Sequence, residues 1–178
     1  SSMIWTARRN ESFTMTMKPN ADPMLIREDD LTGAEIAALL QLHLDHMSHN
    51  SPPESIHALD LDALRRPEIT FWTIWDDAEL LGCGALNELD AKHGEIKSMH
   101  TAQAQRGRGI AGRIVRHLID VAQTRAYQRL SLETGSAAAF APARGLYAGY
   151  GFVPCGPFAS YREDPFSVFM TLELAKRP

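Results

Sequence analysis

A loop rich in glycine and arginine is the part of the sequence best suited to chemistry. It runs from Gln105 to Gly112, reads QRGRGIAG, and is followed by an apolar stripe at helical spacing. Unpaired backbone amides and the positive end of the helix dipole attract anions at such a helix start. Glycine lets phosphate oxygens approach the backbone closely. The pattern therefore predicts a phosphate-binding loop.

Basic residues gather around this loop, although the whole chain of 178 residues carries a net charge of −4. Between Gln103 and Arg129 a single acid, Asp120, accompanies six arginines: Arg106, Arg108, Arg113, Arg116, Arg125 and Arg129. A local basic patch in an acidic protein suits a polyphosphate ligand. General binding to nucleic acid or to an anionic membrane is not indicated.

Two cofactors fit the glycines taken alone. Gly107, Gly109 and Gly112 satisfy the GxGxxG pattern, and Glu133 lies about 20 residues further on, where a nicotinamide dinucleotide fold keeps its ribose-binding acid. In that fold the glycine turn follows its strand directly, whereas here the polar run 101–105 intervenes. The dinucleotide remains the weaker alternative, and the choice between the two cofactors depends on the elements around the loop.

Hydrophobic periodicity predicts a mixed α/β domain with most strands in an antiparallel meander. The expected strands are 24–27, 69–75, 80–89, 95–101, 130–133, 152–153 and 167–174. The expected helices are a first one ending near His49, a less regular segment from Pro53 that ends before Pro67, a third from Gly109, and a short fourth from Pro142 to Gly149. The helix from Gly109, between two strands, requires one parallel crossover.

The length predicts a single domain, at residues 23–178. Residues 1–22 have no clear periodicity and are expected to form a flexible N-terminal extension. The longest apolar run, Ile36 to Leu40, is far too short to span a membrane. Cys83 and Cys155 lie far apart and form no ligand-spaced cluster, as in a reduced cytoplasmic protein.

Two motifs make the chain resemble the GCN5-related N-acetyltransferase (GNAT) superfamily from about residue 24 to 174. The first is Arg106, Gly109 and Ala111 at the spacing of the family's coenzyme A signature. The second is Leu146 to Phe152, LYAGYGF, which matches the family's LYxxxGF about forty residues later. The segment Gly94 to Met99, GEIKSM, is similar to a bacterial branch with a Glu-Ile-Lys-x-Met strand.

The resemblance implies a GNAT fold and acetyl-CoA as co-substrate. Such a fold is α/β (α+β), with a mixed, mostly antiparallel twisted sheet of six to seven strands, about four helices on both faces, and a splay between the central strands that admits the pantetheine arm. The cofactor contacts it implies are Met99, His100, Thr101, Arg106, Gly107, Arg108, Gly109, Ile110, Ala111 and Gly112. Phe140 is a departure, because the family often has a coenzyme-binding Asn there.

By the same resemblance, the activity is direct transfer of acetyl from acetyl-CoA to a primary amine of a small molecule or amino-acid-like acceptor. Glu95 is the expected base, because it lies four residues before Met99, and strand alternation would put both on one face. Alternatively, Glu95 pairs with Lys97 and only orders the cleft. Glu133 on the neighbouring strand is the second candidate base.

Tyr147 is implied as the acid that protonates the departing coenzyme A thiolate, and the Met99 amide as the donor to the oxyanion. Alternatively, Tyr147 is a core aromatic residue beside Tyr150 and Phe152. A protein that binds acyl-CoA without turnover is the other class of function that the sequence leaves open.

The acceptor is expected against the end of the first helix, where the family places its acceptor side. Three histidines, His43, His46 and His49, occur there at intervals of three, which drift around a helix and make a metal site the weakest interpretation. A solvated helix end and an acceptor pocket are the alternatives. The substrate-binding candidates are His46, Ser48, Lys97 and Glu133. We expect a small-molecule amine acceptor as partner, and a homodimer is compatible with the sequence.

Overall fold

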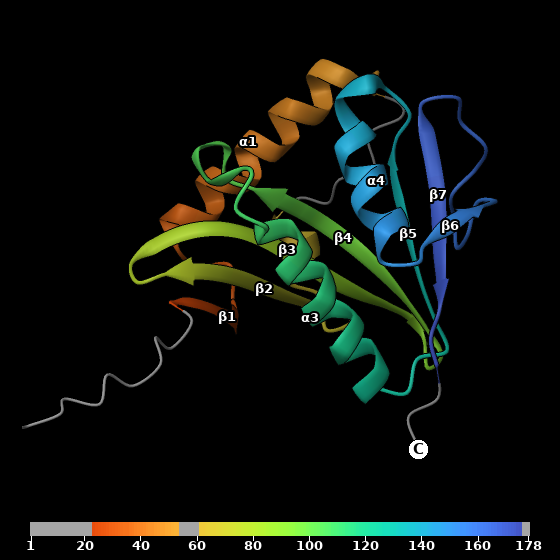
Figure 1. Cartoon of the computed structure of the whole chain (residues 1–178), viewed down its shortest axis with the longest axis horizontal. Coiled ribbons are helices and arrows are strands. Elements are labelled where there is room, and N and C mark those ends of the chain that lie inside the picture. The colour runs from red at the N-terminus through yellow and green to blue at the C-terminus, as the bar shows by residue number, and fades with distance from the viewer. Residues whose placement is uncertain (1–22, 54–60, 176–178) are drawn as a thin grey trace, which may run out of the picture.

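Seven strands and four α-helices make up the part of the chain that the computed structural model describes, residues 23–53 and 61–175 (Figure 1). The strands are β1 Met24–Glu28, β2 Ile69–Asp76, β3 Glu79–Asp90, β4 His93–Thr101, β5 Arg129–Gly135, β6 Val153–Cys155 and β7 Ser167–Glu173. The helices are α1 Ala34–Asn50, α2 Leu61–Leu64, α3 Ile110–Thr124 and α4 Ala141–Gly149, with 3₁₀ turns η2 Gln103–Gln105 and η3 Ala138–Phe140. The expected extension 1–22 lies outside the described residues, as do residues 54–60 of the second helical segment.

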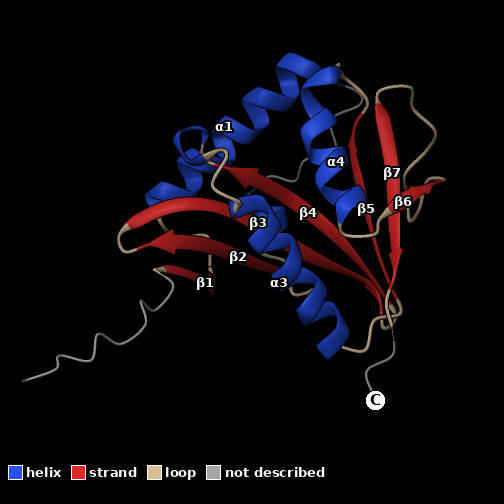
Figure 2. Cartoon of the chain, viewed as in Figure 1, coloured by secondary structure: helices blue, strands red, loops and turns tan. Residues whose placement is uncertain are grey.

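All seven strands belong to one sheet in the order β1-β2-β3-β4-β5-β7-β6 (Figure 2). Strands β1 to β4 form the predicted antiparallel meander, and only β4 and β5 are parallel, joined through α3. The predicted fold class is therefore confirmed. A dinucleotide-binding domain needs a parallel doubly wound sheet, so this topology removes the nicotinamide alternative.

The helices cover both faces of the sheet, and the sheet separates two hydrophobic clusters. On one face α3 packs its apolar stripe, including Ile114 and Leu118, and Tyr147 of α4 belongs to the same cluster. On the other face α1 and α2 bury Ile36, Leu40 and Leu64. Among the described residues, no helix is both long and apolar enough to cross a bilayer.

The sheet opens between its two central strands. Strands β4 and β5 pair only from His93 with Arg129 to Ile96 with Leu132. Beyond that point β5 stays with β7 as far as Gly135, and β4 stays with β3 as far as Thr101. This divergence is the splay expected between the central strands, and it creates the space for the site.

A β-bulge at Ser98 corrects the predicted facing of β4. Two residues of β4, Ser98 and Met99, stand opposite Gly84, and Ser98 has a left-handed φ of 54°. Such an extra residue reverses the alternation of the residues after it. Met99 consequently packs in the cluster of α3, whereas Glu95 lies on the α1 face. The prediction that Glu95 and Met99 share a face is wrong.

Candidate active site

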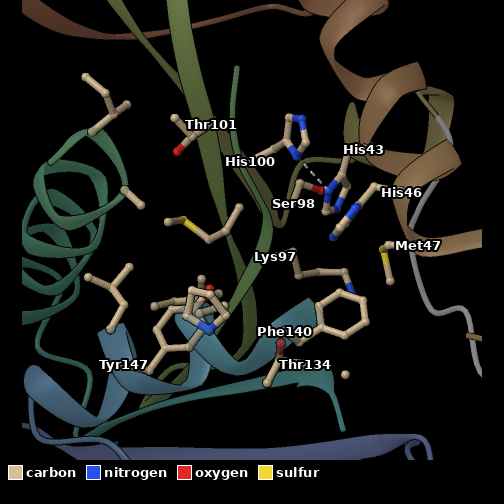
Figure 3. Close-up of a pocket in the computed structure, with 18 of the residues that line it drawn as sticks. His43, His46, Met47, Lys97, Ser98, His100, Thr101, Thr134, Phe140 and Tyr147 are labelled. Carbon is tan, nitrogen blue, oxygen red and sulfur yellow. Dashed lines mark hydrogen bonds between the residues drawn. The ribbon is translucent and has the colours of Figure 1, made fainter. Parts of the chain in front are cut away.

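A cavity of about 500 Å³ occupies the splay between β4 and β5. Its walls are the last two turns of α1, the second half of β4, the glycine loop with the start of α3, the end of β5, and the first turns of α4. Figure 3 shows its polar side, where side chains of α1 and β4 point toward one another. The cavity therefore joins the loop predicted for phosphate to the residues predicted for catalysis.

The glycine loop has the backbone of an anion site. Gly107 and Gly109 have left-handed φ angles of 83° and 75°, which glycine adopts without strain. Gly109 is the N-cap of α3 and no side chain caps this helix end, so its first amides face the loop. Arg106, which follows η2, is exposed to solvent and lines the cavity. This arrangement can hold a diphosphate.

Polar contacts fix the loop from behind. The buried Gln105 side chain donates to Glu79 at 2.5 Å and accepts from Arg108, whose guanidinium also lies 3.5 Å from Asp76. The Tyr150 hydroxyl donates to the Gly112 carbonyl at 2.9 Å. The Arg108 side chain thus points toward β2 and β3 rather than into the cavity, so a cofactor contact by Arg108 would have to come from its backbone.

Glu95 is the centre of a buried polar cluster on the α1 face of the sheet. Its side chain is 3% exposed, and its two carboxylate oxygens accept from Asn87 at 3.2 Å, Lys97 at 3.4 Å and Tyr161 at 2.5 Å. Lys97, in turn, donates to the Tyr161 hydroxyl at 2.9 Å. The alternative that Glu95 pairs with Lys97 is therefore present in the structure, together with a hydroxyl that the sequence analysis did not identify.

Tyr161 comes from the loop between β6 and β7, and this loop carries no periodic signal. Its ring packs against Phe158 and Phe169, with centroids 5.0 and 5.6 Å apart, and it lines the cavity. Glu133, at the end of β5, lines the same cavity and accepts from Ser167 at 2.9 Å. The aromatic residues Phe158 and Tyr161 within this loop are the sequence signal that could have predicted its contact with the sheet.

The histidines divide into a pair in the cavity and a solvated helix end. His43 of α1 and His100 of β4 lie with their Nδ1 atoms 3.3 Å apart (Figure 3), and His46 contacts the Phe140 ring edge-on at 5.4 Å. His49 and Ser48 are exposed and do not line the cavity. No group of three potential metal ligands gathers among residues 23–53 and 61–175.

Burial keeps the paired histidines uncharged. It lowers the pKa of His43 to about 3, with smaller contributions from His100 and His46. It lowers the pKa of His100 to about 4, with smaller contributions from Arg106 and His46. Burial also lowers the pKa of His46, with smaller contributions from Arg106 and His49. Neutral imidazoles can accept hydrogen bonds, so this wall offers acceptors rather than positive charge.

The histidine pair predicts a loss of stability in mild acid. Below about pH 6.5 these two histidines become protonated in the unfolded chain but stay neutral in the folded protein. The free energy of unfolding therefore falls as the pH is lowered from 6.5 toward 4. Each ring contributes at most about 1.4 kcal/mol per pH unit, and less because both retain solvent contact. We expect the fall in Tm from pH 7 to pH 5 to be smaller by about 2–4 °C in His43→Gln. His49→Gln is the matched control, and equal pH dependence in both variants would contradict the assignment.

Tyr147 and Phe140 form the α4 side of the cavity. Tyr147 is 6% exposed, packs against Phe152 with ring centroids 5.8 Å apart, and its pKa is raised by burial. It is both a core residue and a cavity residue, so its two interpretations are compatible. Phe140, which replaces the Asn frequent in the family, is 9% exposed and lies over Gly135.

Most of the residues predicted for the site line this one cavity. The cavity is lined by Glu95, Lys97, Met99, His100, Thr101, Arg106, Gly107, Gly109, Ile110, Ala111, Gly112, Glu133, Tyr147 and His46, whereas Arg108 and Ser48 do not line it. His100, grouped with the cofactor contacts, has its side chain on the α1 face against His43. It therefore faces the side predicted for the acceptor.

The fold and the cavity are those of an acyltransferase, and comparison with known proteins gives the family. Residues 36–152 match the model of the Acetyltransferase (GNAT) family. The chain is 57% identical over 151 residues to the uncharacterized N-acetyltransferase YsnE of Bacillus subtilis, covering 85% of this chain and all of that protein. It is 34% identical over 147 residues to the IAA acetyltransferase of Azospirillum brasilense, covering 82% of this chain and 94% of that protein.

Solved structures of other acetyltransferases have the same fold as this chain. The putative acyl-CoA N-acyltransferase of Klebsiella pneumoniae superposes with a TM-score of 0.69 at 27% identity, covering 85% of this chain and 98% of that one. A GNAT family acetyltransferase of Elizabethkingia anophelis with acetyl-CoA bound has the same fold, with a TM-score of 0.61 at 20% identity over 86% of this chain and all of that one. The chain belongs to the acetyltransferase (GNAT) family and is an acyltransferase, as its motifs predicted.

Proposed function

We propose that the protein transfers the acetyl group of acetyl-CoA directly to a primary amine of a small-molecule acceptor. The observation that carries the proposal is one cavity that joins the anion-binding loop before α3 to the carboxylates Glu95 and Glu133. Acetyl-CoA as the donor is supported by the family and by the acetyl-CoA-bound neighbour of the same fold. The pantetheine arm would enter between β4 and β5, where the two strands no longer pair.

The proton balance of the reaction assigns tasks to the residues of the cavity. An alkyl ammonium, with a pKa of about 10.4, must lose two protons to become an amide. One proton goes to the coenzyme A thiolate and the other leaves to solvent. Glu95 serves as the base that takes the first amine proton. Tyr147, whose pKa burial raises so that its hydroxyl is protonated at neutral pH, gives its proton to the thiolate and regains one from the second proton of the amine nitrogen. The Met99 amide, beside the Ser98 bulge, stabilises the oxyanion.

The charges at the acceptor end favour an amine. Two carboxylates, Glu95 and Glu133, are accompanied by one ammonium, that of Lys97, and Lys97 is already paired with Glu95. A substrate carboxylate would have to compete with Glu95 for Lys97, so an amine without a nearby carboxylate fits better than an amino acid. The name of the Azospirillum relative supports a small molecule as the acceptor.

Release of free thiol from acetyl-CoA, measured for the purified protein against a panel of amines, tests the proposal. We expect release that depends on the amine, with simple alkyl amines better acceptors than α-amino acids. Tight binding of coenzyme A with no thiol release from any amine would identify an acyl-CoA sensor instead. Better turnover with α-amino acids would contradict the assignment of Lys97 as a partner of Glu95.

A further inference from the structure

We propose that Tyr161 is the residue that meets the acceptor amine and passes its proton to Glu95, which makes Tyr161 a catalytic residue of the proposed transfer. The inference rests on the proposed function and extends it to a residue outside both family motifs. It starts from the way in which Glu95 is enclosed.

Both carboxylate oxygens of Glu95 are occupied. The Oε1 atom accepts from Asn87 Nδ2, and Oε2 accepts from both Tyr161 Oη and Lys97 Nζ. With a side chain only 3% exposed, Glu95 offers little surface to a ligand. An acceptor amine in the cavity therefore reaches this carboxylate through one of its hydrogen-bond partners rather than directly.

Tyr161 is the partner able to relay a proton. A lysine ammonium carries three donors and no acceptor, so Lys97 cannot take up a proton while it is charged. The Tyr161 hydroxyl donates to Glu95 Oε2 at 2.5 Å and accepts from Lys97 at 2.9 Å, and a hydroxyl oxygen has a second lone pair for an incoming proton. Tyr161 is half-buried and lines the cavity, where the acceptor would lie.

The surrounding residues hold this hydroxyl in place. The Tyr161 amide donates to the Phe158 carbonyl at 3.0 Å, and its ring packs on Phe158 and Phe169. Lys97 Nζ lies 5.6 Å from the centre of the same ring. The β6–β7 loop is thus fastened to the sheet at the hydroxyl and at the ring, as a relay that must keep its geometry requires.

The step balances without forming a phenolate. The ammonium N–H bond breaks as a new O–H bond forms at Tyr161, while the original Tyr161 O–H bond breaks and its proton joins Glu95 Oε2. Burial and the carboxylates of Glu95 and Glu133 raise the pKa of Tyr161, so the tyrosine stays neutral before and after the transfer. When the product leaves, the proton returns from Glu95 through Tyr161 to water.

Tyr161→Phe tests the relay, because it removes the hydroxyl and keeps the ring. With the best alkyl amine of the panel at pH 7.5, we expect kcat to fall by about 10²-fold and the KM for acetyl-CoA to stay within about twofold. Fluorinated derivatives of that amine have lower pKa values and arrive uncharged, so the deficit should shrink along the series. A purely structural role for Tyr161 would slow all amines equally.

Tyr127→Phe is the matched control. The Tyr127 hydroxyl donates to Glu88 at 2.8 Å in the same kind of tyrosine–glutamate pair, but neither residue lines the cavity. We expect no change in the dependence on amine pKa for this variant. The double variant Tyr161→Phe with Glu95→Gln should be no slower than Glu95→Gln alone, because the two residues act in one step.

Three results would overturn the relay without contradicting acetyl transfer itself. They are a wild-type kcat in Tyr161→Phe, a loss of kcat that stays constant over the amine series, and additive losses in the double variant. Failure of the proposed function is a different outcome, because the wild-type protein would then acetylate no amine at all. Equal Tm values for Tyr161→Phe and the wild type establish that the variant is folded.

Discussion

The Glu95→Gln variant is expected to turn over about 10² to 10⁴ times more slowly than the wild type at neutral pH, while it continues to bind acetyl-CoA. Gln has the shape of Glu but takes up no proton, so an ammonium acceptor has no route to its reactive form. The loss should be greatest at low pH and smaller as the solution itself deprotonates the amine. Thiol release followed from pH 6 to pH 9 measures the effect.

The same change disturbs an ion pair, and this effect has to be separated from catalysis. Lys97 lies 3.4 Å from Glu95 with a side chain 10% exposed, so Glu95→Gln leaves a nearly buried ammonium without its partner. Breaking such a pair costs about 3–5 kcal/mol. The double variant Glu95→Gln with Lys97→Met also removes the unpaired Lys97 ammonium. We expect the Tm to recover and kcat to remain low.

Recovery of kcat in that double variant would show that Glu95 is only the counter-ion of Lys97. The measurement thus decides between the two interpretations that the sequence left open for this carboxylate. The structure contains the ion pair, and the Tyr161 hydroxyl on the same oxygen gives the carboxylate a second task. A kcat that stays low at restored stability therefore assigns the loss to the missing carboxylate itself.

Patterns of regular period made most of the fold predictable. The alternating and apolar runs predicted every strand, and the apolar stripe predicted a helix from Gly109, which in the structure is the N-cap of α3. Boundaries differed by one or two residues in most elements, because strand ends continue as long as a neighbour supplies hydrogen bonds. The splay between β4 and β5 followed from the family motifs, and the register confirms it.

The features that the sequence did not predict depend on single residues that belong to no periodic pattern. The bulge at Ser98 adds one residue to β4 and turns Met99 to the face opposite Glu95, which no alternation rule can anticipate. Tyr161 reaches Glu95 across 66 positions of chain from the β6–β7 loop, which carries no periodic signal. The resemblance implied Arg108 as a cofactor contact, and the sequence could not show that Asp76 and Gln105 bind its side chain outside the cavity.

Gly135→Ala is expected to destabilise the protein by about 1–3 kcal/mol, the usual cost of overpacking. A Cβ on Gly135 would lie 2.1 Å from the Phe140 ring, far inside van der Waals contact. The backbone has little freedom to move away, because Arg144 donates to the carbonyls of Gly135 and Ala137 at 2.7 and 3.0 Å. The ring has to move instead, and thermal unfolding should show a Tm lower by several degrees.

Because Phe140 lines the cavity, the displaced ring would also occupy space meant for the ligand. We therefore expect the KM for acetyl-CoA to rise in Gly135→Ala. Gly145→Ala, whose Cβ would meet nothing within 4 Å, should leave the KM unchanged and should not lower the Tm, because alanine favours the interior of helix α4 more than glycine does. Gly145→Ala is the control for the general effect of adding a methyl group.

A double-mutant cycle attributes the cost to one contact. Phe140→Ala alone should cost about 3–5 kcal/mol, since it empties a site that is 9% exposed. In the double variant the new methyl group meets no ring, so the total should be smaller than the sum of the single effects by about 1–3 kcal/mol. Additive effects would mean that Gly135 is required for a reason other than Phe140. Coupling would show that the aromatic residue in place of the family's Asn is tolerated because β5 ends in a glycine.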